Sequence, residues 1–107
     1  MLGRAIRQAV EAWAPAKRVG ILGSGGLSHF FVDEELDRHV LDLLAKKDGE
    51  ALSALPAAKL ESGNSEIRNW IATAGAVEHL EMKLVDYVPS YRSEAGTGVG
   101  MAFAVWQ

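Results

Sequence analysis

The fold is decided by one stretch, Arg18-Val19-Gly20-Ile21-Leu22-Gly23-Ser24-Gly25-Gly26-Leu27-Ser28-His29. Its apolar run predicts a buried strand from about Arg18 to Leu22, and the glycines that follow predict a sharp turn with exposed backbone. In an open α/β sheet, ligands bind outside the carboxyl ends of the strands. We therefore expect His29 at the rim of a site, where an imidazole is well suited to moving protons near neutral pH.

Length and composition narrow the class of protein. The chain has 107 residues, 49% of them hydrophobic, and a net charge of -3, which predicts one small globular domain over residues 1–107. It has no cysteine, which excludes disulfides, thiolate metal sites and a cysteine nucleophile. Basic residues are not clustered, so the sequence gives no support to nucleic-acid binding. No apolar run approaches the roughly 18 residues that span a bilayer, and we expect a cytoplasmic protein.

Apolar residues at helical spacing predict three main helices around this stretch. The first is amphipathic and ends before Pro15, because proline cannot continue a helix. The second begins at Asp33, whose side chain suits the N-cap, and ends with Gly49 at the C′ position. The third opens after Gly63, with Asn64 or Ser65 as its cap.

The C-terminal third predicts strands. Residues 80–88 alternate and then become apolar, which indicates a strand that Pro89 ends. Val99 to Trp106 predicts a final strand that forms a hairpin-like pair with it, and residues 49–58 predict a turn with one short helix. The fold class is therefore α/β, in the order helix–strand–helix–helix–strand–strand around one sheet.

The residues alone leave several interpretations of the candidate site open. The glycine turn is either a tight strand-to-helix connection or a phosphate loop, although the phosphate-loop lysine after Gly26 and the third Rossmann glycine are both missing. His29 is either a catalytic group or an ordinary histidine, and Glu66 is a typical helix-start carboxylate. His39 is expected to be solvated, and His79 follows a helix end.

Three stretches occur in a fixed order and spacing. They are Gly23–His29, Gly63–Ala76, and a tail that contains Tyr87–Pro89 and Gly96–Ala104. Together they resemble the C-terminal part of the type III extradiol ring-cleavage dioxygenases, which include the protocatechuate 4,5-dioxygenase beta subunit and gallate dioxygenase. The resemblance covers nearly the whole chain and implies a fragment of that α/β dioxygenase fold.

The resemblance implies an enzyme that opens catechol-type rings with O2, using non-haem Fe(II) held by two histidines and one glutamate. By resemblance, Glu66 matches the metal-binding glutamate and His29 matches the acid/base histidine. The two histidine ligands of the family come from an N-terminal half that this chain does not contain. We therefore expect the chain alone to bind no iron and to be inactive.

Two expectations about partners follow from the resemblance. Some relatives complete their pocket with a small partner subunit. A chain without the covering half should expose apolar surface, so we expect a homo-oligomer, with Trp13, Trp106 or the strand edges at the contact. The alternative function is a non-catalytic truncated family member that acts as an assembly or interaction module. A small nucleotide-binding domain is a third interpretation.

Overall fold

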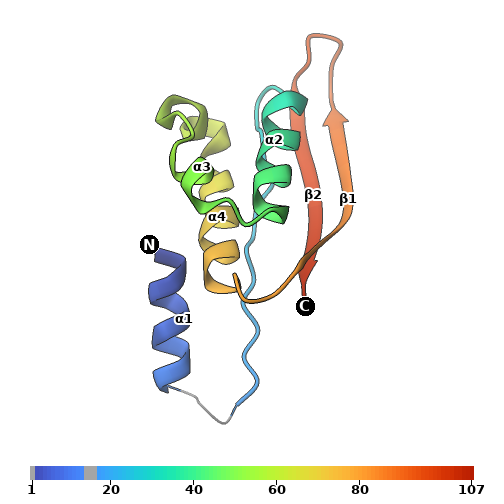
Figure 1. The fold of residues 1–107 in the computed structure, drawn as a ribbon. Coiled ribbons are helices and arrows are strands. Elements are labelled where there is room, and N and C mark those ends of the chain that lie inside the picture. Colours follow the sequence, from blue (N-terminus) through green and yellow to red (C-terminus); the bar gives the residue numbers. More distant parts are fainter. Residues whose placement is uncertain (1, 14–16) are drawn as a thin grey trace.

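The computed structural model describes residues 2–13 and 17–107. In chain order its helices are α1 (Leu2–Trp13), α2 (Glu34–Ala45), α3 (Gly49–Ser53), the 3-10 turns η1 (Ala57–Leu60) and η2 (Ser62–Glu66), and α4 (Ile67–Ala76). Strands β1 (Met82–Tyr91) and β2 (Gly98–Trp106) follow and form one antiparallel pair. The hairpin lies along one side of α2, whereas α3 and α4 lie on its other side (Figure 1). The predicted α/β class is confirmed.

Helix α2 begins as the sequence predicts. The Asp33 carboxylate accepts a hydrogen bond from Leu36 N at 3.0 Å, and acidic side chains follow in the first turn, where the helix dipole favours them. The prediction for Gly49 at the C′ position is wrong. Lys47 takes the left-handed conformation after this helix, with φ of 58°, and Asp48 caps α3 by accepting from Ala51 N. Gly49 is therefore the first residue of α3.

The C-terminal hairpin confirms the predicted strand pair, with one difference in length. Strand β1 continues through Pro89 to Tyr91 and pairs with β2 along its whole length, apart from an irregularity between Leu84 and Asp86. Pro89 was expected to end the strand. It is tolerated because β1 is an edge strand with β2 on only one side, so a missing N–H group can face away from the ladder.

The strand predicted from Arg18 to Leu22 does not form. This segment is irregular in the structure, and Leu22 is 94% exposed. The chain meets β2 only further on, where Leu27 N donates to Gly100 O at 2.8 Å, and Phe31 then bridges Thr97 just before β2. An apolar run becomes a strand only where its backbone groups are paired, and here a groove lies between residues 19–23 and β2, so these residues have no backbone partner among the described residues.

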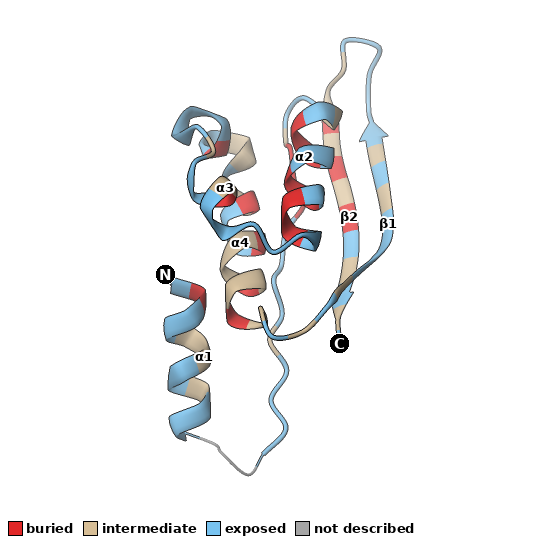
Figure 2. Cartoon of the chain, in the orientation of Figure 1, coloured by how far each residue is buried: buried red, intermediate tan, exposed pale blue. Residues whose placement is uncertain are grey.

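The core lies between α2, α4 and the inner face of the hairpin. Buried residues concentrate on the facing sides of α2 and α4 and on the first half of β2, whereas β1 is largely exposed (Figure 2). Leu27, Val40 and Ile67 are fully buried, and Trp70 packs against Trp106 with ring centroids 6.3 Å apart. Leu27, two residues before His29, is thus held by the main packing of the molecule.

Helix α1 lies against α4 at the end remote from the hairpin tip (Figure 1). Its one buried residue is Gly3, where a Cβ atom would lie 2.6 Å from Gly75 Cα. Arg4 adds an ion pair to Glu78 at 2.9 Å. Among the described helices, none has the length and hydropathy that a membrane span requires.

Candidate functional site

His29 lies in the connection between the glycine turn and α2, and its backbone and ring are both held. Its N–H group donates to Asn64 Oδ1 at 2.9 Å, and its Nδ1 lies 2.9 Å from Leu27 O. A carbonyl oxygen can only accept, so Nδ1 carries the hydrogen and donates it. The second ring nitrogen, Nε2, is therefore the atom that is free to take up or release a proton. The side chain is 24% exposed.

Glu66 lies at the N-cap of α4 and reaches back to the turn. Its Oε2 atom accepts a hydrogen bond from Gly26 N at 2.9 Å and lies 3.4 Å from His29 Nε2. Gly25 has φ of 124°, which favours glycine, and a Cβ atom there would lie 2.7 Å from the Glu66 carboxyl carbon. The turn therefore needs glycine both for its backbone and for the approach of the carboxylate.

The structure thus brings together the two residues that the sequence singled out, although they are 37 positions apart. A proton on Nε2 of His29 faces a carboxylate across 3.4 Å. His39 and His79 do not join them: both are exposed, and His79 lies near Arg7. The roles predicted for His29 and Glu66, as acid/base and metal ligand, stay predictions.

The described residues do not fit a complete iron site. Over residues 2–13 and 17–107, no group of three histidine, cysteine or acidic side chains converges on a point where a metal ion could be held. The pair supplies one imidazole and one carboxylate, and Glu66 Oε2 already accepts the Gly26 N–H group. A facial triad needs a further histidine that these residues do not bring to the site.

The phosphate-loop interpretation of the glycine turn also loses support. In such a loop the backbone N–H groups point at the phosphate. Here the Gly26 N–H group is taken by the carboxylate of Glu66. The negative charge of that carboxylate would oppose an anion at the same position.

Side chains of α4 hold the rest of the turn. Asn69 Nδ2 donates to Ser24 O at 2.9 Å, and Trp70 Nε1 donates to Gly25 O at 3.0 Å. Trp70 lies in the core with 6% of its surface exposed, and its indole N–H also anchors the turn. Asn64 or Ser65 was expected as the helix cap, but Glu66 occupies the N-cap of α4. The Asn64 side chain instead accepts from His29 N and donates to Lys59 O.

A buried polar network lies directly behind His29. The Asp37 carboxylate, which has no exposed surface, accepts from Ser28 N at 2.9 Å, Ser28 Oγ at 2.7 Å and Tyr87 Oη at 2.6 Å. Burial of the phenol, its hydrogen bond to Asp37 and the charges of Asp37 and Glu34 together raise the pKa of Tyr87. The sequence analysis missed this network. The available signal was an aspartate on the apolar face of a helix, one residue after Leu36 and three before Val40.

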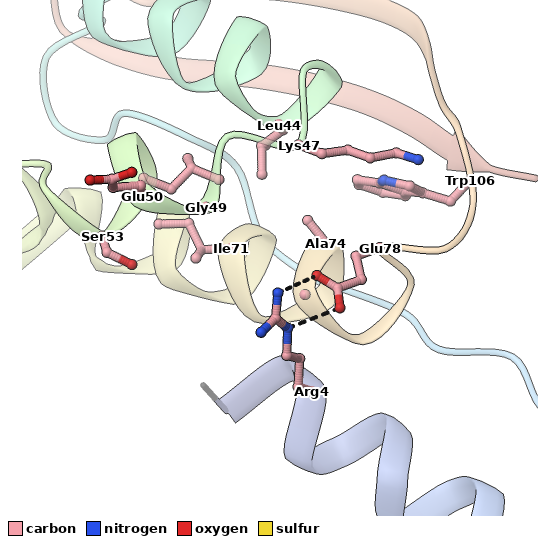
Figure 3. Close-up of a pocket in the computed structure, with 12 residues that line it drawn as sticks. Arg4, Leu44, Lys47, Gly49, Glu50, Ser53, Ile71, Ala74, Glu78 and Trp106 are labelled. Carbon is pink, nitrogen blue, oxygen red and sulfur yellow. Dashed lines mark hydrogen bonds and ion pairs between the residues drawn. The ribbon is translucent and has the colours of Figure 1, made fainter.

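Two hollows flank these elements. A groove of about 670 Å³ separates the irregular segment from the free edge of β2, and its lining includes Gly25 and Gly26, beside the His29–Glu66 pair. A second cavity of about 370 Å³ lies between α2, α3 and α4 (Figure 3). Figure 3 shows the Arg4–Glu78 ion pair on one side of this cavity and Leu44, Ile71 and Trp106 around it. Neither His29 nor Glu66 lines the second cavity.

The fold and the pair define a small α/β chain with a candidate proton-transfer site beside a glycine turn. Residues 1–103 match the family described as the catalytic LigB subunit of aromatic ring-opening dioxygenase, and the chain belongs to this family. No curated protein and no solved structure matches the chain. The family match agrees with the predicted dioxygenase relationship at the level of aromatic ring opening and does not distinguish among ring substrates.

Proposed function

We propose that this chain contributes the acid/base histidine and one metal-binding carboxylate to an extradiol dioxygenase that opens catechol-type rings, such as protocatechuate or gallate, with O2. The observation that carries the proposal is the approach of His29 Nε2 to Glu66 Oε2 at 3.4 Å beside the glycine turn. Membership of the ring-opening family supports it. The described residues lack a complete triad. Another polypeptide segment would therefore have to supply the two histidine ligands of the Fe(II).

In this proposal His29 handles a proton at a defined atom. Because Nδ1 donates to Leu27 O, the ring presents Nε2 to the space in front of Glu66. A group in this position can accept a phenolic proton when a catechol binds and return it later. When bound, the iron would supply the activation of oxygen, and the protein would supply geometry and proton control.

The groove beside β2 supports the requirement for a further segment. It is lined by residues 19–23 with Gly25 and Gly26, by Met101–Trp106 of β2, and by Trp70, Thr73, Val77 and Leu80. Residues 19–23 make no hydrogen bond to any other described residue. An extended segment placed here would satisfy these backbone groups and would end beside His29 and Glu66.

Oxygen uptake with protocatechuate or gallate tests the proposal. We expect no turnover from the chain alone, with or without added Fe(II), and turnover when it is co-expressed with the histidine-containing N-terminal part of a family member. In the reconstituted enzyme, His29→Ala should lower kcat about 10²- to 10⁴-fold, the usual contribution of general acid–base catalysis. His39→Ala is the matched control, since His39 is exposed on α2. Robust turnover by the isolated chain, or full activity of His29→Ala, would contradict the proposal.

The second candidate is an assembly or interaction module without catalysis. The open edge of β2 and the exposed apolar side chains beside it favour this function. The two candidates differ in one measurement. A pure interaction module would bind its partner equally well with and without His29 and would give no oxygen uptake in any combination.

A further inference from the structure

The buried network behind His29 is built around one peptide unit. The Leu27 carbonyl and the Ser28 N–H belong to the same planar peptide group, and they point in opposite directions. Asp37 Oδ1 accepts from this N–H at 2.9 Å, whereas His29 Nδ1 donates to this carbonyl at 2.9 Å. The orientation of the carbonyl, and with it the orientation of the imidazole, is therefore coupled to the carboxylate.

The carboxylate itself has little freedom to move. It is fully buried in α2, and its second oxygen accepts from Ser28 Oγ and from Tyr87 Oη of β1. The hydroxyl of Ser28 also accepts from Asp33 N, which is the cap residue of α2. The carboxylate thus links the turn to both the helix and the hairpin. The carboxylate makes no ion pair with a cation among the described residues, so its negative charge is stabilised by these three hydrogen bonds. Hydrogen bonds to an ionised acceptor are stronger than those between neutral groups.

We propose that Asp37 is a positioning residue for His29: by fixing the Leu27–Ser28 peptide, it keeps the hydrogen on Nδ1 and turns Nε2 toward Glu66. The catalytic meaning of this inference rests on the proposed function. The geometric claim does not, because the ring tautomer is a property of the chain without substrate or metal. Asn64 fixes the next N–H group, so the peptide units on both sides of Ser28 are held by different elements.

Histidine-labelled ¹⁵N NMR at about pH 8, where an ordinary imidazole is neutral, tests the inference. In the unmodified chain, His29 should show the Nδ1–H tautomer, and the exposed His39 serves as the internal reference. In Asp37→Ala the Nδ1–H fraction of His29 relative to Nε2–H should fall about fivefold to tenfold, the usual value of one hydrogen bond. Asp37→Asn keeps an acceptor without charge and should lie between the two, with a fall of about twofold.

Two further variants separate positioning from general stability. Asp48→Ala removes a similar carboxylate-to-amide hydrogen bond, at the start of α3 and away from His29, and should leave the tautomer unchanged. Tyr87→Phe removes one donor but keeps the bond between Asp37 and Ser28, so it should also leave His29 on Nδ1–H. If Asp37→Ala does not fold, Asp37→Asn decides. A folded Asp37→Asn chain with the unmodified tautomer ratio would overturn the inference, as would a folded Asp37→Ala chain with that ratio.

The reconstituted enzyme gives a separate readout. Asp37→Asn should lower kcat with little change in KM, because Asp37 is fully buried behind His29 and is out of reach of a substrate. If no combination of segments turns over substrate, the proposed function fails while the tautomer measurement still stands. If turnover is recovered and the tautomer ratio of His29 is the same in the Asp37 variants as in the unmodified chain, the positioning role fails and the proposed function stands.

Discussion

At the scale of single residues, the packing around Asp37 leaves no space on the side of β2. Gly100 lies against this carboxylate and pairs with the turn through both its N–H and its carbonyl. A Cβ atom at this position would collide with Asp37 Oδ2 and would lie 3.0 Å from Ser28 Oγ. The carboxylate cannot swing aside without losing its donors, so the glycine is required by contact and not by its backbone conformation.

Gly100→Ala should therefore destabilise the chain by about 1–3 kcal/mol, the usual cost of overpacking a filled site. Urea unfolding followed by circular dichroism measures this cost. Gly49→Ala is the matched control, because a Cβ atom there meets nothing within 4 Å. Its helical position predicts a neutral effect or a gain of up to about 1 kcal/mol. Equal stability of the two variants would show that the region around Asp37 is loosely packed.

Tyr87 should ionise only at unusually high pH. Burial comes first among the causes, followed by the hydrogen bond to Asp37 and the nearby acidic charges, and all of these raise its pKa. A group whose pKa is raised by folding stabilises the folded state below its unfolded pKa, and that contribution is lost as the pH rises through the folded value. The free energy of unfolding should therefore fall above about pH 10, the ordinary pKa of tyrosine.

Phenolate absorbance measures this directly in Tyr91→Phe, since the chain has two tyrosines and this variant leaves only Tyr87. The folded variant should develop its absorbance at higher pH than the same variant unfolded in urea. Coincident titration curves would contradict the burial and hydrogen bonding of the Tyr87 hydroxyl.

At the scale of elements, the sequence predicted what local chemistry decides. Asp33 caps α2 and the hairpin pairs as expected, because caps and alternation act over a few residues. The end predicted for the first helix at Pro15 lies outside the described residues. The predicted strand at residues 18–22 failed because strand formation depends on a partner elsewhere in the molecule. For the same reason the family resemblance could nominate His29 and Glu66, whereas Asn64 was predicted only as a possible helix cap, because its hydrogen bond to His29 N spans 35 residues.

The contact between α1 and α4 gives a prediction at this scale. It depends on the absence of a side chain at Gly3, where a Cβ atom would approach Ala72 O to 2.5 Å as well as Gly75 Cα. Gly3→Val should separate α1 from α4 and lower the free energy of unfolding by about 1–3 kcal/mol. Amide hydrogen exchange should show loss of protection in α1. Ala9→Val places the same side chain on an exposed position of α1 and should leave the two helices in contact.

At the scale of the whole molecule, much apolar surface lies along one side of the hairpin and the irregular segment. Leu22 is 94% exposed, and Phe103 and Val105 on β2 are 51% and 43% exposed. Trp13 at the end of α1 is also exposed, whereas Trp106 packs against Trp70. An open strand edge with apolar neighbours favours pairing with another chain. We propose that the chain self-associates through the edge of β2, and that Trp106 contributes less than its neighbours.

The register of the hairpin provides a variant that blocks this association without disturbing the strands. Phe103 lies opposite Asp86 and Val105 lies opposite Lys83. The double variant Phe103→Lys, Val105→Glu therefore gives each new charge a partner of opposite sign across the strands, which contributes about 0.2–1 kcal/mol per pair. The same charges disfavour burial against a second apolar edge.

Light scattering over a concentration series should show an oligomer for the unmodified chain and the 11.5 kDa monomer for the double variant. The control carries the same charges at exposed positions of other elements, His39→Lys with Ala9→Glu, and should remain associated. A monomeric unmodified chain, or a double variant that stays associated, would rule out the β2 edge as the contact, and the groove beside it would then be open to another polypeptide.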